Sequence, residues 1–392
     1  MPTGGHSGLR VVVIGAGIVG AACAYYLSRD GHRVTVLDRG AIAGGTSSRG
    51  EGNLLVSDKG PGPELELALY SSRLWREIGD DVGPGRIELE AKGGVVVAAS
   101  SQALSALQAF AHRQRAAGVE TVVADPTDLV ELEPLISPDL AGGVSYPQDL
   151  QVQPVLAVAA LLRAARSAGA TVRRDTEVVG ALPGGRSRSE PGGVLTTAGP
   201  IVADVVINAA GTWSTEVARR LGGAVPVLPR RGFVLVTEPL PPLIRHKVYS
   251  ADYVANVASG SEGLETSAVV EATPGGPVLI GASRERVGFD SRLRVDVVRV
   301  LAGQAIAIFP FLSDVALMRV YHGFRPYCPD HLPVIGPDPR VPGLWHACGH
   351  EGAGVGLAPA TGALIADLVA GRPSAVDPEP FAAHRFADRV RA

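Results

Sequence analysis

Three glycines and one carboxylate near the N-terminus have the residue types and the spacing that hold a dinucleotide. The glycines directly follow the apolar, β-branched run 11–14 and are Gly15, Gly17 and Gly20. The first glycine permits a tight turn, the second lets a pyrophosphate approach the backbone, and the third lets the next helix pack on the strand. Asp38 closes the next apolar run, where a carboxylate accepts hydrogen bonds from ribose hydroxyls.

The order of strand, turn and helix around these glycines predicts a βαβ unit that binds a dinucleotide, and the alternative is the same unit without a ligand. Helical periodicity begins at Ile18 and Val19, so the phosphates would lie at the positive end of the helix. The unit cannot by itself distinguish NAD from FAD. Three further segments rich in small residues, 44–53, 205–214 and 343–356, favour FAD, because FAD is longer and is contacted by distant parts of a chain.

Several side chains of the central and C-terminal parts could bind an acidic amine substrate. Arg325, in the run GFRP, could hold a carboxylate through two parallel hydrogen bonds, or it could form a structural pair with Asp330. His350 and Glu351 could bond the cofactor ring or the substrate amine, or they could cap the helix that follows. Two weaker pocket candidates are Arg231 and Tyr253.

Composition and spacing argue against several other functions. The 36 basic and 39 acidic residues give a net charge of −3, which provides no electrostatic reason to bind nucleic acid or an anionic membrane. Histidines crowd residues 322–350 without the spacing of a metal site, so no metal is expected. Three cysteines without a CxxC pattern fit a reducing cytoplasm. The N-terminus lacks the pattern of a signal peptide, and no integral membrane segment is expected.

Five stretches together resemble the D-amino-acid oxidase type of FAD-dependent amine oxidoreductases, which includes glycine and sarcosine oxidases and D-amino-acid dehydrogenases. They are VVVIGAGIVG with LDR, GTSSRGEGN, VVINAAGTWS, GFRPYCPDHLPVIGP and GLWHACGHEGAGVGLAPATG, and the resemblance runs from about residue 10 to 372. Within the family, GEGNLLVSDKGPGPELELALYSSRLW and GHEGAGVGLAPATG look most like the flavin subunits of hydroxyproline dehydrogenase, opine oxidase and hydrogen cyanide synthase. That likeness implies a second flavoprotein and a small iron–sulfur protein as partners.

The resemblance implies FAD as the cofactor and assigns the residues that would hold it. These fall at the ADP half (Gly15, Gly17, Ile18, Val19, Gly20, Asp38 and Arg39), near the phosphates (Thr46 and Ser47), at the flavin (Gly52 and Asn53), at the adenine (Val178), at a second ADP-side loop (Gly211), and at the pyrimidine edge of the ring (Gly349, Glu351, Gly352, Gly354 and Val355).

Two departures from sarcosine oxidases bear on the chemistry. Some of those enzymes bond FAD through a cysteine whose position matches Gly323, with Cys328 offset, so FAD is expected to be non-covalent here. They also place a lysine that assists oxygen on the strand matching 278–281, which is apolar in this chain, and we match Leu279 to that lysine. This favours a dehydrogenase that passes electrons to another acceptor.

The predicted fold class is α/β, or α+β overall, with two discontinuous domains. A Rossmann-like FAD-binding domain takes residues 1–85, 145–225 and 322–392. A substrate-binding domain takes residues 86–144 and 226–321 and is built on a mostly antiparallel sheet. Residues 181–200, rich in Gly, Pro, Arg and Ser, are expected to form a surface excursion.

The predicted function is oxidation of a small amino acid or secondary amine to an imine by hydride transfer to flavin N5. Proline, hydroxyproline, sarcosine, glycine, an opine and a D-amino acid are the candidate substrates, with Arg325 as the carboxylate anchor. One alternative is a flavin-bearing electron-relay subunit that has no turnover of its own. Another is an NAD-dependent dehydrogenase.

Overall fold

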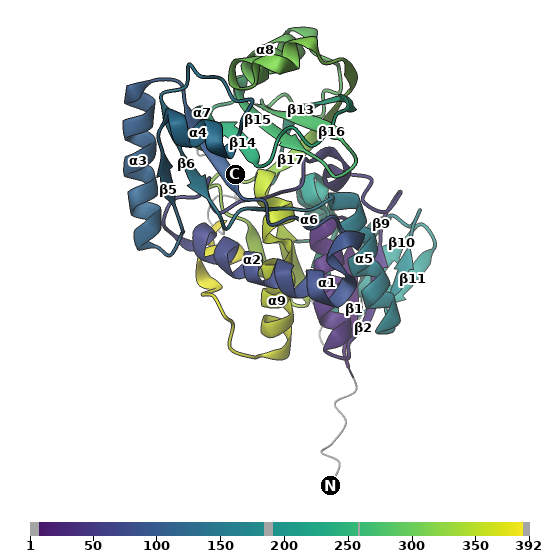
Figure 1. Ribbon diagram of the computed structural model, residues 1–392. Helices are drawn as coiled ribbons and strands as arrows, with labels where there is room; N and C mark the ends of the chain where they lie inside the picture. The colour runs from purple at the N-terminus through teal and green to yellow at the C-terminus, as the bar shows by residue number, and fades with distance from the viewer. Residues whose placement is uncertain (1–7, 184–190, 258, 387–392) are drawn as a thin grey trace.

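The run of β-branched residues after the N-terminus forms the middle of a six-stranded sheet. A computed structural model describes residues 8–183, 191–257 and 259–386 (Figure 1). The strand order is β18-β19-β12-β1-β2-β8, and every neighbouring pair is parallel except β18 with β19. The strands are β1 (Arg10–Ile14), β2 (Arg33–Leu37), β8 (Thr171–Arg173), β12 (Val205–Asn208), β18 (Val334–Pro337) and β19 (Leu344–Cys348).

Helices cover this first sheet and form the main hydrophobic core with it. α1 packs against both α5 and α9, and α9 also packs against α2. Their bounds are α1 (Ile18–Arg29), α2 (Pro63–Val82), α5 (Pro154–Ser167), α6 (Ser214–Arg220) and α9 (Gly354–Ala370). Gly362 lets α1 and α9 meet closely, since an added Cβ there would lie 2.7 Å from the Ala22 backbone.

A second, eight-stranded sheet lies beside the first, with α8 on its far side (Figure 1). Its order is β17-β13-β16-β15-β14-β4-β6-β5, and β4 with β14 is its parallel pair. The strands are β4 (Gly94–Ala98), β5 (Val122–Ala124), β6 (Gly142–Tyr146), β13 (Leu228–Pro239), β14 (Lys247–Ser250), β15 (Glu265–Ala272), β16 (Pro277–Arg284) and β17 (Leu317–Tyr327); the helices are α3 (Ser101–Ala116), α4 (Pro126–Leu132), α7 (Ala251–Val257) and α8 (Val295–Ile308). The predicted fold class is confirmed.

Two small sheets complete the described fold. β9 (Val178–Pro183), β10 (Pro191–Thr196) and β11 (Gly199–Val202) form an antiparallel sheet, and β3 (Asn53–Leu54) pairs with β7 (Leu150–Gln151). The surface excursion predicted at 181–200 falls in these strands for residues 181–183, 191–196 and 199–200, while 184–190 lie outside the described residues. Leu195 and Val202 of this small sheet are exposed.

Two of the four predicted domain boundaries, those at 144/145 and 321/322, fall inside strands of the second sheet. β6 runs across the boundary at 145, and β17 runs across the boundary at 322. β17 pairs antiparallel with β13 from Leu317 to Tyr327, and the chain then leads into β18 of the first sheet. The division by residue number stays a prediction, and β17 is a direct connection between the two sheets.

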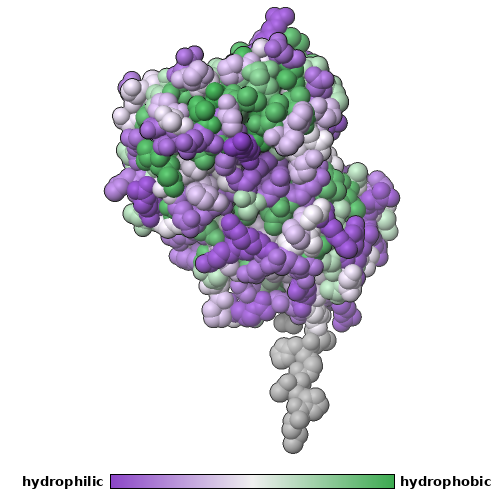
Figure 2. Space-filling view, viewed as in Figure 1, coloured by the Kyte–Doolittle hydropathy of each residue, from purple (hydrophilic) through white to green (hydrophobic). Residues whose placement is uncertain are grey.

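Two apolar parts of the molecule are a surface region near α8 and the helix α9. Figure 2 shows apolar side chains on the upper part of one face, in the region of α8, where Val295 and Val300 are exposed. Among the described residues, the helical segment Glu351–Ala370 is long and apolar enough to cross a membrane, but 61% of its window is buried inside the molecule. Its packing on α1 and α2 is that of a core helix. The three cysteines are free and buried.

We expect Gly362→Ala to lower the free energy of unfolding by about 1–3 kcal/mol, because the added methyl overpacks the contact of α9 with α1. Urea denaturation measures the change. Gly303→Ala in α8 is the matched control, since a Cβ there meets no atom within 4 Å, and it should be neutral or stabilising by up to about 1 kcal/mol. Equal effects of the two substitutions would contradict this account of the α1–α9 contact.

Candidate active site

A cavity of about 440 Å³ lies where the carboxyl ends of β1, β2 and β12 face the second sheet. Parallel sheets bind ligands at this edge, because the loops that follow the strands diverge there. Its walls include Ile14 at the end of β1, Asp38 after β2 and Ala209 after β12, while Val234 of β13 closes the opposite side. Elements remote in the chain therefore line one cavity.

The glycine turn after β1 has the conformation that its sequence predicts. Gly15 has φ +110°, in the region that favours glycine, and a Cβ on Gly20 would overlap the Gly15 carbonyl oxygen. Asp38 supports the turn because its carboxylate accepts from the backbone N–H of Ala16 (2.8 Å) and of Gly40 (2.9 Å). Each carboxylate oxygen has a second lone pair, so Asp38 can also accept from a ribose hydroxyl.

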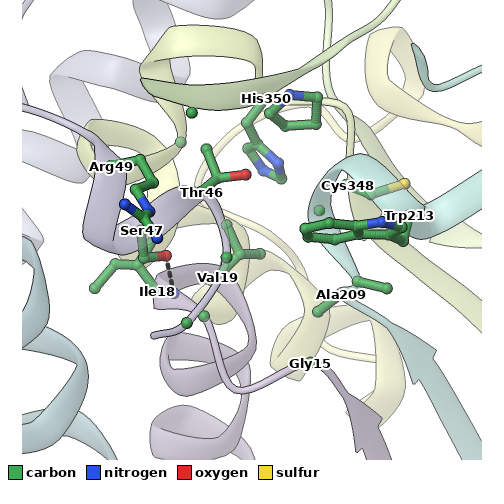
Figure 3. Close-up of a pocket in the computed structure, with 18 of the residues that line it drawn as sticks. Gly15, Ile18, Val19, Thr46, Ser47, Arg49, Ala209, Trp213, Cys348 and His350 are labelled. Carbon is green, nitrogen blue, oxygen red and sulfur yellow. Dashed lines mark hydrogen bonds between the residues drawn. The ribbon is translucent and has the colours of Figure 1, made fainter. Parts of the chain in front are cut away.

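Hydroxyl side chains of the segment 44–53 lie near the first turn of α1. Ser47 Oγ accepts from the Ile18 N–H (2.9 Å), and Thr46 Oγ1 donates to the Phe324 carbonyl (2.7 Å). Figure 3 shows Thr46 and Ser47 above the start of α1, with Trp213 on the other side of the space. This is the expected surrounding of a pyrophosphate, where a helix N-terminus and short hydroxyl side chains converge.

One end of the cavity is bordered by Val178 at the start of β9 and by Glu177 beside it. We call it the adenine end, because the family resemblance assigns Val178 to the adenine. Arg220 ties this end together, since it donates to the Val178 carbonyl (2.8 Å) and to Glu177 (2.6 Å). On the neighbouring wall the guanidinium of Arg39 lies 4.5 Å from the Trp213 ring centroid. An aromatic ring and bare backbone at this end suit a flat base and its ribose.

Bare backbone also forms the other end of the cavity. Gly52 has φ +102°, and a Cβ there would overlap the Val152 carbonyl, so only glycine fits. α9 begins at Gly354 without a side-chain cap, which leaves its first amides free to face an anionic ring edge. His350 is buried, its Nε2 lies 2.9 Å from Thr361 Oγ1, and burial lowers its pKa to about 3, so the ring is neutral.

Arg325 reaches the same end of the cavity from β17. Its Nη1 donates to the Ser283 carbonyl (2.8 Å), and it forms no ion pair among the described residues. The alternative pairing with Asp330 is wrong, because Arg385 occupies that carboxylate at 2.7 Å. Burial, and next the nearby Arg284 charge, lower the pKa of Arg325. A guanidinium held this way has donors left for a ligand carboxylate.

Arg231 does not line the cavity, and the proposal that it binds substrate is corrected here. Successive side chains of a strand point to opposite faces. On β13, Arg231 therefore turns away and donates to Glu285 (2.7 Å), while Arg230 turns toward Glu351 (3.3 Å). Glu351 thus has a structural partner as well as a place in the cavity wall.

The structure brings most of the predicted site residues to this one cavity. Those that line it are Gly15, Gly17, Ile18, Val19, Asp38, Arg39, Thr46, Ser47, Gly52, Asn53, Val178, Gly211, Tyr253, Arg325, His350, Glu351, Gly352, Gly354 and Val355. Three do not line it: Gly20, Gly349 and Arg231. Within the described ranges, no group of three His, Cys, Asp or Glu could hold a metal.

Sequence reasoning missed four residues that matter here. Glu51, Trp213 and Cys348 line the cavity, and Lys247 reaches it indirectly through a hydrogen bond to Asn53. Lys247 is buried and paired with Glu271 of β15. The run GEGN contained Glu51 as a signal, but only the packing of distant strands reveals its surroundings.

The residues that line the cavity suit each part of FAD. It has a glycine turn and carboxylate for the ADP half, a helix start with hydroxyls for the phosphates, and a second uncapped helix start at its far end. At Gly52 a Cβ would overlap other atoms, so the cavity wall there consists of backbone without a side chain.

Comparison with known proteins agrees with this geometry. Residues 10–368 match the FAD dependent oxidoreductase family, DAO. Glycine oxidase of Geobacillus kaustophilus is 29% identical over 97% of this chain and 98% of its own, and its crystal structure gives a TM-score of 0.85 over 96% and 99%. Hydrogen cyanide synthase subunit HcnC of Pseudomonas aeruginosa is 30% identical over 96% of each chain. L-proline dehydrogenase from P. horikoshii, 24% identical, shares the fold with a TM-score of 0.86 over 97% and 98%.

The chain belongs to the DAO family of FAD-dependent oxidoreductases. It is an oxidoreductase whose cofactor is FAD, which confirms the predicted enzyme class and cofactor and rules against the NAD-dependent alternative.

The neutral, buried His350 makes stability depend on pH. Its pKa falls from 6.5 to about 3 on folding, so between these values the unfolded chain binds a proton that the folded protein excludes. Its contribution is complete above pH 6.5 and is lost as the pH falls. On going from about pH 7 to pH 5, wild type should lose roughly 2 kcal/mol more unfolding free energy than His350→Gln.

Urea denaturation at the two pH values checks this, with His112→Gln on the exposed face of α3 as the matched substitution. Identical pH slopes for wild type and His350→Gln would contradict a neutral imidazole in the folded site.

Proposed function

We propose that this protein oxidises a small amino acid or secondary amine, and that Arg325 binds the substrate carboxylate. The supporting observation is a half-buried guanidinium at the end of the cavity that lacks a carboxylate partner among the described residues. Partial burial without a partner costs free energy, and a ligand carboxylate would offset that cost.

The surroundings of Arg325 would orient the substrate. Gly352 lies against it, since a Cβ there would be 3.6 Å from the Arg325 side chain, and Tyr253 lines the same end of the cavity. FAD, when bound, supplies the ring that accepts the hydride from the carbon next to the amine. The chain supplies position: a fork that fixes the carboxylate, and walls that exclude water from the reacting carbon.

The proposed substrate class also draws on the relatives. The glycine oxidases act on an amino acid by name, and the family match covers almost the whole chain. The candidates are hydroxyproline, D-proline, sarcosine and glycine, followed by opines and other D-amino acids. Anaerobic mixing of the purified yellow protein with each of them should bleach the flavin absorbance for at least one. Absence of bleaching with the whole set would refute the proposal.

We further propose that FAD is held without a covalent bond. Gly323 lines the cavity at the position matched to the attachment cysteine, and Cys328 is buried away from the cavity. Cys348 does line it, but burial raises the pKa of its thiol to about 12, which leaves the unreactive thiol form. Acid precipitation should therefore release the flavin into the supernatant.

A second candidate function is that of a flavin subunit in a larger assembly. The observation that favours it is the 30% identity to HcnC, which is named as a subunit, over 96% of both chains. The partners proposed are a second flavoprotein and a small iron–sulfur protein, in the cytoplasm. Copurification of such partners, with activity only in the complex, would support this function over independent turnover.

The electron acceptor requires a direct measurement. An apolar residue at Leu279 favoured a dehydrogenase, but the structure places the buried ammonium of Lys247 on Asn53 from a different strand. The lack of a lysine on β16 is therefore no argument by itself against oxygen. Mixing the reduced protein with air-saturated buffer distinguishes an oxidase, which reoxidises rapidly, from a dehydrogenase.

We expect Arg325→Ala to reduce substrate binding or transition-state stabilisation by about 2–5 kcal/mol, because the substrate carboxylate would be buried without its partner. Anaerobic flavin reduction with the active amine gives both the dissociation constant and the rate. Arg319→Ala, an exposed arginine on the same strand, is the matched control and should resemble wild type. Wild-type kinetics in Arg325→Ala would show that Arg325 does not bind the substrate carboxylate.

A further inference from the structure

Glu51 is a buried carboxylate in the cavity wall, and one of its oxygens has no hydrogen-bond partner. It lies between the short helix Thr46–Arg49 and β3, lines the cavity, and is 8% exposed. Its Oε2 accepts a hydrogen bond from Asn53 Nδ2 (3.3 Å). Its Oε1 has no hydrogen-bond partner among the described residues and is itself buried.

The Glu51 carboxylate packs against β16 at Gly281, where the absence of a side chain makes room for it. A Cβ on Gly281 would overlap Glu51 Oε1, so the side chain sits against bare backbone of the second sheet. Glu51 comes from the FAD-side segment and Gly281 comes from the opposite wall. The carboxylate therefore stands at the junction of the two sheets, beside the proposed substrate position at Arg325.

The cations nearest to Glu51 are engaged elsewhere. Arg325 donates to a carbonyl, Lys247 pairs with Glu271, and the guanidinium of Arg284 lies over the Tyr253 ring at 4.9 Å. None of them forms an ion pair with Glu51 within the described ranges. Their charges still stabilise the carboxylate at longer range, while its Oε1 keeps an unused hydrogen-bonding capacity.

The other acidic groups of the cavity wall are occupied. Asp38 accepts from two backbone amides, and Glu351 interacts with Arg230 and His331. At the adenine end, Arg220 holds both neighbouring carboxylates, those of Glu177 and Glu216. His350 is bonded to Thr361 and neutral. Two carboxylates of the cavity wall have a buried oxygen without a hydrogen bond among the described residues, those of Glu51 and Glu351. Glu351 Oε1 lies 2.9 Å from His331 Nδ1, whereas Glu51 forms no ion pair among them.

Hydride loss next to nitrogen requires a neutral amine, whereas an aliphatic amine in water is protonated up to about pH 10. We propose, on the basis of the proposed function, that Glu51 binds the substrate ammonium and accepts its proton. The step converts ammonium and carboxylate to neutral amine and carboxylic acid; one N–H bond breaks, one O–H bond forms, and no electrons are transferred. Arg325 and Glu51 would then bind the two ends of a zwitterionic amino acid.

The electrostatic surroundings suit this exchange. Burial, and next the Glu271 charge, raise the pKa of Glu51 to about 7, against lowering by Arg325, Lys247 and Arg284. A carboxyl group with a pKa near the working pH can both accept and release a proton. The titratable and charged groups that face it are Lys247 of β14, Glu271 of β15, Arg284 of β16, Tyr321 and Arg325 of β17, and Tyr253 of α7.

The decisive experiment is anaerobic flavin reduction in the holoenzyme, measured against pH with the amine that reduces it. In Glu51→Gln the second-order rate should fall by about 100-fold or more near pH 7 and recover above the pKa of the amine, where no proton has to be removed. A purely structural loss would not be rescued by high pH. Glu66→Gln, exposed on α2, is the control and should follow wild type.

A second measurement does not depend on turnover. Infrared difference spectra of the substrate-free holoenzyme between about pH 6 and pH 8 should show a carboxylic acid converting to carboxylate. Burial also raises the pKa of Glu64 to about 7 and that of Asp149 to about 6, so both contribute to the same band. The amplitude should therefore be unchanged in Glu66→Gln and smaller by one carboxyl group in Glu51→Gln. An unchanged amplitude in Glu51→Gln would overturn the proposal, and so would loss of FAD from that variant, because Glu51 would then serve the cofactor.

The outcomes separate this inference from the proposed function. A wild-type flavin that no amine reduces would refute both. A wild type that is reduced, with Glu51→Gln giving the same rate at every pH, would refute the role of Glu51 alone.

Discussion

The antiparallel pairing of β17 with β13 is the constraint on which the site depends. This ladder places Arg325 opposite Arg230, and β17 then leads through a short turn into β18 of the first sheet. β17 is therefore a strand of the second sheet, and the segment after it connects it to the first sheet. Because a shift of one residue in a strand exchanges its two faces, the register of this pair decides which side chains reach the cavity.

Around this ladder, charged side chains fall into two groups. Some form buried ion pairs that support the fold, such as Arg231 with Glu285 and Lys247 with Glu271. Others border the cavity with unused hydrogen-bonding capacity, such as Arg325 and Glu51. Burying a charge costs several kcal/mol unless a partner is present. The unpaired group is accordingly the part of the structure in which a ligand would compensate that cost, which connects stability to binding.

Membership in the FAD-dependent oxidoreductase family agrees with both halves of the cavity. Glycine turns and the starts of α1 and α9, at opposite ends of the cavity, provide backbone donors, which suit a long phosphate-bearing cofactor whatever the substrate. The second sheet supplies the opposite wall of the cavity, including Val234 of β13 and Arg325 of β17. The first sheet and its loops thus provide the part of the cavity that fits the cofactor, and the second sheet provides the side chains to which we assign the substrate.

The sequence by itself determined the βαβ unit, the glycine turn, Asp38 and the mixed fold, because each depends on neighbours within a few tens of residues. The run GFRP also indicated Arg325 as a candidate for binding a carboxylate. Tertiary structure alone decided that Asp330 belongs to Arg385, that Arg231 points away from the cavity, and that Glu51 keeps a free oxygen against Gly281. These outcomes depend on strand register and on contacts between residues more than 50 positions apart. A residue type shows which bonds a side chain can make, but only packing shows which of them remain available.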